Sequence, residues 1–129
     1  DSPVTHDEIV RAAYEGLAFL YADTFNSLKK ITGIPFDNVY IVGGGSKNEL
    51  LNQMTANSTG LPVVSGPIEA TAIGNILIQM IALGEIDDIE NGRLLVRRSF
   101  RNEINNYTPV NRNKWIEAKN TWDVYSKSI

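Results

Sequence analysis

The segment Val39–Leu51, with the sequence Val-Tyr-Ile-Val-Gly-Gly-Gly-Ser-Lys-Asn-Glu-Leu-Leu, constrains the fold more than any other part of the chain. Its first four residues form a short apolar run that is typical of a strand covered on both faces. Three glycines follow, and residues without a Cβ allow positive φ angles and a close approach of the backbone to another group. Ser46 and Glu49 have the spacing of a capping box, which predicts Ser46 as the N-cap and Lys47 as the first residue of a helix.

This strand, turn and helix favour one kind of ligand without requiring it. The unpaired N–H groups at a helix start, together with the helix dipole, favour an anion such as a phosphate. Similar glycine turns also occur in α/β domains that bind no ligand, and the spacing matches neither a P-loop nor a dinucleotide-binding fingerprint. The spacing alone therefore leaves anion binding and a purely structural turn as alternatives.

Composition limits the class of protein. The chain has 129 residues, 43% hydrophobic and 21% charged, which indicates one globular domain over residues 1–129. The formal net charge is −3, and we expect no nucleic-acid partner. The one basic cluster is expected to be the solvated side of a helix and consists of Arg93, Arg97, Arg98 and Arg101.

Cysteine and histidine usage removes several kinds of site. The chain has no cysteine and His6 is its single histidine, so disulfide frameworks, Ser-His-Asp or Cys-His catalysis and multi-histidine zinc sites are excluded. No apolar run reaches membrane-spanning length, so we expect no membrane partner and a cytoplasmic location.

Hydrophobic periodicity predicts further elements on both sides of the glycine segment. A capping box at Thr5 and Glu8 begins a long helix that ends near Thr32, before Gly33. Its apolar stripe is expected to face the core and consists of Val10, Tyr14, Leu17, Tyr21, Phe25 and Leu28. The other expected elements are a helix up to Gly60, a strand at Leu61–Ser65, a helix near Glu69–Leu83, a short helix capped by Asp87 or Asp88 that reaches Val96, a loop or short edge strand within Arg101–Thr108, and a helix near Asn113–Lys127.

Two short strands joined through a helix predict a small parallel sheet, which two strands cannot complete alone. Since the chain begins at Asp1 without an initiator methionine, we expect a piece of a longer protein that supplies further strands. The third helix begins with small residues, which favours close helix packing over ligand contact, namely Ala70, Thr71, Ala72 and Gly74. The last helix has one face expected to serve packing, formed by Trp115, Ala118, Trp122 and Tyr125.

Three segments, Ile41–Asn57, Gly60–Val64 and Gly66–Asn75, resemble the C-terminal domain of the FGGY carbohydrate kinases. The features that carry the resemblance are Leu-Asn-Gln after the triple glycine, the Gly-Pro-x-Glu-Ala segment and the final Gly-Asn, and within the family they are most similar to the rhamnulokinase subgroup. The resemblance extends from Thr5 to about Leu83 and is weaker beyond Phe100. It implies an α/β fold that forms the C-terminal part of an actin-like ATPase (ribonuclease H-like) domain, with short buried strands flanked by helices.

The same resemblance implies a site. ATP with Mg²⁺ would bind in a cleft between two domains, with this chain as the later part of the nucleotide-side domain. Gly44 would lie against the phosphates, Gly43 and Gly45 would shape the loop, and Asn48, on the first helical turn, would contact the adenine. Ser46 is expected to be a cap rather than a ligand. A ketose sugar would be bound mainly by a preceding domain that this chain lacks.

Catalysis is expected to depend on residues outside this chain. Phosphoryl transfer needs a group that positions or deprotonates the attacking hydroxyl. FGGY kinases take it from an aspartate in an upstream segment of Gly, His, Asp and Thr type, and this chain contains no such segment. We therefore assign no catalytic residue and no metal ligand, and expect the isolated chain to be inactive. Glu69 is attributed to the helix dipole, with contact to metal or substrate as the less favoured alternative.

The preferred interpretation is thus part of an enzyme that transfers the γ-phosphate of ATP to the 1-hydroxyl of L-rhamnulose. One alternative is another FGGY kinase that acts on fuculose, xylulose, ribulose or glycerol. Another is a non-catalytic nucleotide-sensing module on the same fold. A dinucleotide oxidoreductase is disfavoured because no acidic residue ends a second strand at the distance needed to hold a ribose.

Overall fold

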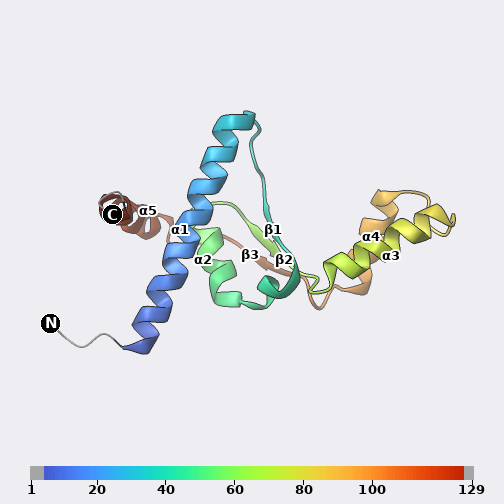
Figure 1. Cartoon of the computed structure of the whole chain (residues 1–129), viewed down its shortest axis with the longest axis horizontal. Helices are drawn as coiled ribbons and strands as arrows, with labels where there is room; N and C mark the ends of the chain where they lie inside the picture. The colour runs from blue at the N-terminus through green and yellow to red at the C-terminus, as the bar shows by residue number, and fades with distance from the viewer. Residues whose placement is uncertain (1–4, 127–129) are drawn as a thin grey trace. The chain divides into compact units, whose positions relative to one another are not determined.

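The computed structural model describes residues 5–126, and its elements are drawn along the chain in Figure 1. Helices and short strands alternate, which makes the described part of the chain α/β. In chain order the elements are α1 (His6–Thr32), β1 (Val39–Ile41), the 3₁₀ helix η1 (Gly43–Lys47), α2 (Glu49–Thr59), β2 (Val63–Ser65), α3 (Ala70–Ala82), α4 (Ile89–Ser99), β3 (Asn105–Tyr107) and α5 (Arg112–Ser126).

Helix α1 begins and ends at the predicted signals. The Glu8 N–H donates to Thr5 Oγ1 at 3.3 Å, and the Thr5 N–H donates to Glu8 Oε2 at 2.8 Å, which completes the capping box. The Thr5 hydroxyl also donates to Glu8 Oε2, at 2.9 Å. The bonds that the Thr5 N–H and hydroxyl donate to the Glu8 carboxylate lower its pKa, because they stabilise its charged form. At the other end Gly33 is left-handed, with φ of 70°, and its N–H donates to Lys29 O.

The three strands form one sheet in the order β1-β2-β3. The Val39 N–H donates to Pro62 O at 2.9 Å and the Gly66 N–H donates to Ile41 O at 2.8 Å. Both partners advance in the same direction along the chain, so β1 and β2 are parallel, as the sequence predicts. The expectation that β1 is covered on both faces is wrong, because Val39 is buried whereas Tyr40 is 64% exposed. β3 is the short edge strand that was one of two alternatives for its segment.

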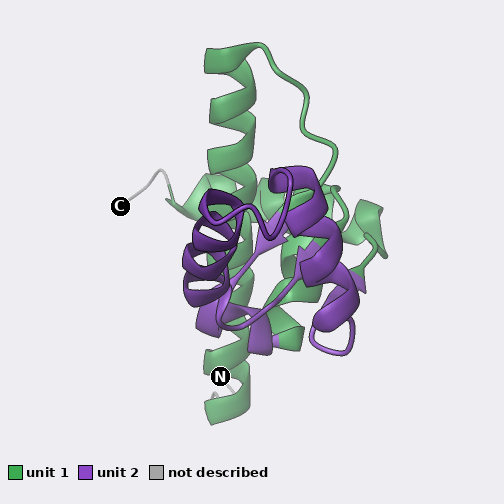
Figure 2. Cartoon of the chain, turned by 90° about the vertical axis from the view of Figure 1, so that its right-hand side faces the viewer, with its two compact units in different colours: residues 1–39, 49–63, 107–129 green, residues 40–48, 64–106 purple. Residues whose placement is uncertain are grey.

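The chain divides into two compact units, coloured separately in Figure 2. Unit 1 comprises residues 1–39, 49–63 and 107–129, and unit 2 comprises residues 40–48 and 64–106. The core of unit 1 is aromatic, since the ring of Phe19 lies 5.5 Å from that of Trp115 and 5.8 Å from that of Trp122. Unit 2 contains the glycine turn, α3 and α4, and each unit is described below by itself.

The face of α1 that is buried in unit 1 differs from the predicted one. The buried residues of α1 are Gly16, Ala18, Phe19 and Ala22, while most of the predicted stripe is exposed. Small residues on the buried face allow close approach: Ser58 Oγ donates to Ala18 O at 2.7 Å, and a Cβ at Gly16 would lie 3.1 Å from Trp122. Close packing, and not the size of the apolar residues, therefore selects the core side of this helix.

Two other packing predictions also need correction. On α5, Trp115 and Trp122 pack on Phe19 as expected, but Tyr125 is 69% exposed. On α3, Leu77 is the one buried side chain, and its Cδ2 would lie 3.4 Å from a Cβ at Gly92 of α4. At the start of α3 the predicted close packing is not seen at Gly74, where a Cβ would meet no atom within 4 Å.

Candidate functional site

The glycine turn of unit 2 is a short 3₁₀ helix. It begins after the extended residue Val42, and Gly43 has φ of 77°, a conformation that favours glycine. The Asn48 N–H donates to Gly45 O at 3.1 Å and ends the turn. Three consecutive glycines thus let the chain leave β1 and turn tightly within five residues.

The predicted helix start is wrong at this turn. Ser46 lies inside η1, where its Oγ donates to Gly43 O at 2.6 Å, and α2 begins at Glu49 instead of Lys47. The capping box spacing predicted the wrong first residue of α2, because the 3₁₀ turn uses the residues that a cap would need. Asn48 accordingly precedes α2 and does not lie on its first turn. Its side chain is half-buried.

Backbone hydrogen bonds from the segment after β2 fix the position of the turn. The Gly43 N–H donates to Pro67 O at 3.3 Å, and Gly66 bonds to Ile41 at the end of β1. Gly66 has φ of 93°, and any Cβ there would collide with Glu103 O. A glycine is therefore required at Gly66 for steric as well as conformational reasons.

The central glycine of the turn faces open space. Gly44 and Gly45 are exposed, and a Cβ at Gly44 would meet no atom within 4 Å. A Cβ at Gly45 would make only an ordinary contact, at 3.8 Å from Ile41 Cγ2. No described side chain blocks the backbone at Gly44, so a ligand can approach it.

Unit 2 also contains a cavity of about 620 Å³. Its walls are mainly apolar and include Val42, Val64, Ala70, Ile73, Leu77 and Val96. Glu90, Arg93 and Arg97 add charge, and Arg93 Nη1 pairs with Glu90 Oε1 at 2.6 Å. None of the four predicted nucleotide residues lines the cavity, although Val42 directly precedes them. Sequence patterns gave no indication of this cavity, because its walls come from strands and helices that are distant in the chain.

Charged residues of unit 2 support no metal site within the described part of the chain. Residues 5–126 contain no group of three or more His, Asp or Glu side chains that could hold an ion. Glu69 occupies the N-cap position of α3 and makes no side-chain capping bond. The basic cluster on and just after α4 is exposed, as expected for a solvated helix face.

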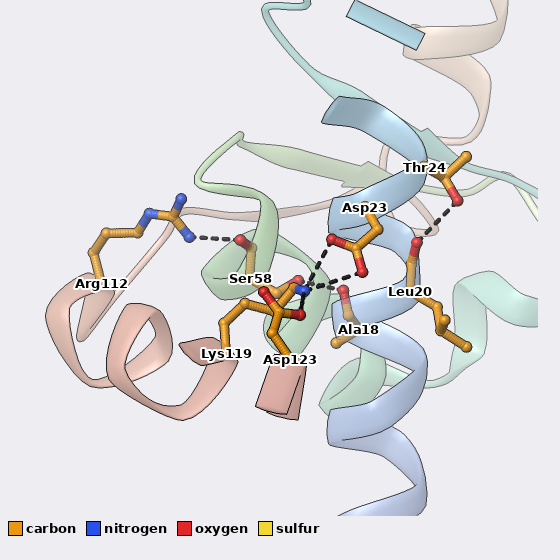
Figure 3. Close-up of polar contacts among 8 residues, drawn as sticks. All are labelled: Ala18, Leu20, Asp23, Thr24, Ser58, Arg112, Lys119 and Asp123. Atoms are coloured by element: carbon orange, nitrogen blue, oxygen red, sulfur yellow. Dashed lines mark hydrogen bonds and ion pairs between the residues drawn. The ribbon is translucent and has the colours of Figure 1, made fainter. Parts of the chain in front are cut away.

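The sequence analysis missed a polar cluster in unit 1, which Figure 3 shows. Lys119 of α5 pairs with Asp23 of α1 at 2.9 Å and with Asp123 one turn along its own helix. Arg112 Nη1 donates to the main-chain carbonyls of Asn57 and Ser58, at 2.8 and 2.5 Å, and so caps the end of α2. Only the i,i+4 pair of Lys119 and Asp123 could have been found from sequence spacing.

A search of the described helices finds none that could cross a membrane.

Residues 1–83 match the family model for the FGGY family of carbohydrate kinases, C-terminal domain. A rhamnulokinase of Bacteroides thetaiotaomicron is 42% identical over 116 residues, which cover 90% of this chain and 24% of the relative. A rhamnulokinase of Bacillus subtilis is 41% identical over the same shares of both chains, and one of Ligilactobacillus salivarius is 45% identical over 83% of this chain. The chain spans about a quarter of the length of these curated relatives.

Proposed function

Since the chain belongs to the FGGY family of carbohydrate kinases, we propose that it is the ATP-binding part of a rhamnulokinase. The family consists of phosphotransferases with a sugar acceptor, and its C-terminal domain has the actin-like ATPase fold. The proposed reaction transfers the γ-phosphate of ATP to the 1-hydroxyl of L-rhamnulose, in the cytoplasm. The shared rhamnulokinase name of three relatives above 40% identity supports this choice of sugar.

The observation that carries the ATP proposal is the open backbone at Gly44. A phosphate group needs close approach to backbone N–H groups, and a side chain would prevent it. At Gly44 a Cβ would meet nothing within 4 Å, and the turn is held by its bonds to the segment after β2. We assign Gly44 to the phosphates, Gly43 and Gly45 to the shape of the turn, and Asn48 to the adenine.

In this proposal the chain binds the nucleotide, and residues in other parts of a full-length kinase carry out the phosphoryl transfer. ATP would bring Mg²⁺ to the site on its phosphates, which is a common way for this ion to bind. The residues of this chain would bind and orient the nucleotide, and we assign none of them as catalytic. The aspartate base and most sugar contacts would belong to chain beyond these 129 residues.

The test uses a kinase of the same length as the relatives, with this chain as its C-terminal part. Gly44→Val should raise the KM for ATP at least about tenfold while the KM for sugar changes little, because the new side chain fills the space assigned to phosphate. Gly74→Val is the matched control, since a Cβ there also meets nothing within 4 Å. Unchanged ATP kinetics in Gly44→Val would remove Gly44 from the site.

The sugar is tested separately, with a panel of rhamnulose, fuculose, xylulose, ribulose and glycerol. The highest kcat/KM is expected for L-rhamnulose, and a preference for another acceptor would replace the sugar assignment without touching the ATP site. The purified 129-residue chain should show no sugar-dependent ATP turnover. Turnover by that chain would contradict the assignment of the base to other parts of the protein.

A further inference from the structure

Ser46 is the buried residue of the glycine turn. Its exposed fraction is 6%, whereas Gly44 and Gly45 beside it are exposed. The Ser46 hydroxyl donates to Gly43 O at 2.6 Å, which is at the short end of the range for an O–H donor and a carbonyl oxygen. The backbone hydrogen bonds of a 3₁₀ helix have poorer geometry than those of an α-helix, so a side-chain bond adds to what holds this turn.

The carbonyl that Ser46 holds belongs to the same peptide group as the Gly44 N–H. The peptide between Gly43 and Gly44 is trans. In a trans peptide the C=O and the N–H point in opposite directions, so a carbonyl held toward Ser46 directs the Gly44 N–H away from it. Gly44 is exposed, and a Cβ there would meet no atom within 4 Å. The bond at Gly43 O therefore sets the direction of an N–H group on the open side of the turn.

This peptide lacks the side chains that normally restrict rotation. Both of the residues that it joins are glycines, and Gly43 already has φ of 77°. The bond from the Gly43 N–H to Pro67 O, at 3.3 Å, fixes the preceding peptide and not this one. If the peptide turned over, Gly43 O would face the open side, where its partial negative charge would repel an anion. The Ser46 hydroxyl opposes that rotation.

We propose that Ser46 is a positioning residue for the nucleotide phosphates, because its hydroxyl keeps the Gly44 N–H directed at them. Ser46 itself touches no atom of the nucleotide. The inference rests on the proposed function, since it requires phosphate at Gly44. Without the hydroxyl the peptide would populate both orientations, and the apparent affinity for the phosphates would fall by the fraction that remains competent to bind.

Equilibrium titration tests this role in a kinase of the same length as the relatives, with this chain as its C-terminal part. Ser46→Ala should raise the Kd for ADP about three- to tenfold, the effect expected from losing one hydrogen bond between uncharged groups. The Kd for adenosine should stay within about twofold of the wild-type value, since adenosine carries no phosphate. A merely structural role of Ser46 would weaken the binding of both ligands alike.

Two further variants separate the hydrogen bond from packing and from stability. Ser46→Cys fills the same space, but a thiol is a weak donor, so this variant should weaken ADP binding nearly as much as Ser46→Ala. Ser58→Ala removes a matching bond in unit 1, where a serine that is 7% exposed donates to Ala18 O at 2.7 Å. It should lower the midpoint of thermal unfolding and leave the Kd for ADP unchanged.

Three results would overturn the inference: an unchanged Kd for ADP in Ser46→Ala, an equal loss of ADP and adenosine affinity, or wild-type ADP binding by Ser46→Cys. Gly44→Val distinguishes this failure from failure of the proposed function. If Gly44→Val weakens ADP binding and Ser46→Ala does not, the nucleotide site stands and the role of Ser46 is wrong. If neither variant weakens ADP binding, the phosphate assignment at Gly44 is wrong and the role of Ser46 fails with it.

Discussion

The two units differ in what holds them together. Of the eight buried apolar residues of the described chain, seven belong to unit 1 and Leu77 alone belongs to unit 2. Unit 1 joins α1, α2 and α5 through aromatic contacts, the Lys119 ion pairs and the carbonyl contacts of Arg112. In unit 2 the glycine turn is positioned mainly by backbone hydrogen bonds and by Gly66, where any Cβ would collide with Glu103 O.

This difference indicates that the residues that stabilise the fold and the residues proposed to bind a ligand lie in different units. A surface that receives a ligand has to leave backbone groups and space uncovered, whereas a core has to fill its space. The proposed nucleotide residues lie in the unit with one buried apolar side chain, and the aromatic core lies in the other. We therefore expect unit 1 to supply most of the free energy of unfolding and unit 2 to open at lower cost.

The largest predicted effect tests this directly. Phe19→Ala should lower the free energy of unfolding by about 3–5 kcal/mol, because it removes the ring between Trp115 and Trp122. Leu77→Ala should cost less, about 2 kcal/mol, because it removes fewer buried carbon atoms than Phe19→Ala. Urea unfolding followed by tryptophan fluorescence measures the first, since both tryptophans are in unit 1. Amide exchange in α3 and α4 measures the second.

As the control, each variant is also measured with the method that reports on the other unit. Leu77→Ala should leave the urea midpoint of tryptophan fluorescence nearly unchanged, and should speed amide exchange in α3 and α4. If both variants shift the fluorescence midpoint by similar amounts, the two units unfold together and the comparison fails.

The sequence predicted the positions of the elements better than it predicted their packing. The Thr5 capping box and Gly33 gave both ends of α1, because these signals are local. The buried face of α1 was predicted wrongly, since a periodic row of large apolar residues does not reveal whether α2 and α5 cover it. The positions of Ala18 and Gly16 mattered more, because they allow neighbouring helices to approach closely.

At the candidate site, too, the sequence predicted the position of an element but not its detailed structure. The triple glycine was visible in the sequence as a turn, and the family resemblance indicated its ligand. Its internal structure was not predicted, because Ser46 bonds back to Gly43 O and shifts the start of α2 to Glu49. The roles assigned to Gly43, Gly44, Gly45 and Asn48 stay predictions until nucleotide binding is measured.

The second prediction compares a glycine from each unit. Gly60→Ala should destabilise unit 1 by roughly 2 kcal/mol, because Gly60 has φ of 73° and a Cβ there would lie 2.9 Å from Arg112 Nε. Gly44→Ala should change the free energy of unfolding by less than about 0.5 kcal/mol, because a Cβ there meets nothing. Thermal unfolding by circular dichroism measures both.

If Gly44→Ala proved as costly as Gly60→Ala, the glycine turn would be needed for folding and not kept open for a ligand. A small cost at Gly44 combined with a large rise in the KM for ATP in the full-length kinase would assign this glycine to binding alone.

The smallest predicted effect concerns Lys119, whose side chain is 19% exposed. Burial lowers the pKa of this ammonium, but its hydrogen bonds to Asp123 and Asp23 outweigh burial, and the pKa is raised above the usual 10.5. A lysine with a raised pKa in the folded state stabilises the fold fully below the unfolded value, and this contribution is lost as pH rises through the folded value. Lys119→Met should cost roughly 1 kcal/mol at neutral pH.

Because the contribution is lost in base, the difference in free energy of unfolding between wild type and Lys119→Met should be constant from neutral pH up to pH 10.5 and should shrink above it. Lys114→Met, at an exposed lysine of the same helix, is the control and corrects for the other groups that titrate in this range. Urea unfolding at a series of pH values gives the difference. A difference that does not depend on pH would mean that Lys119 joins α1 and α5 by packing of its alkyl chain and not by charge. Ion pairs would then no longer count among the interactions that hold unit 1 together.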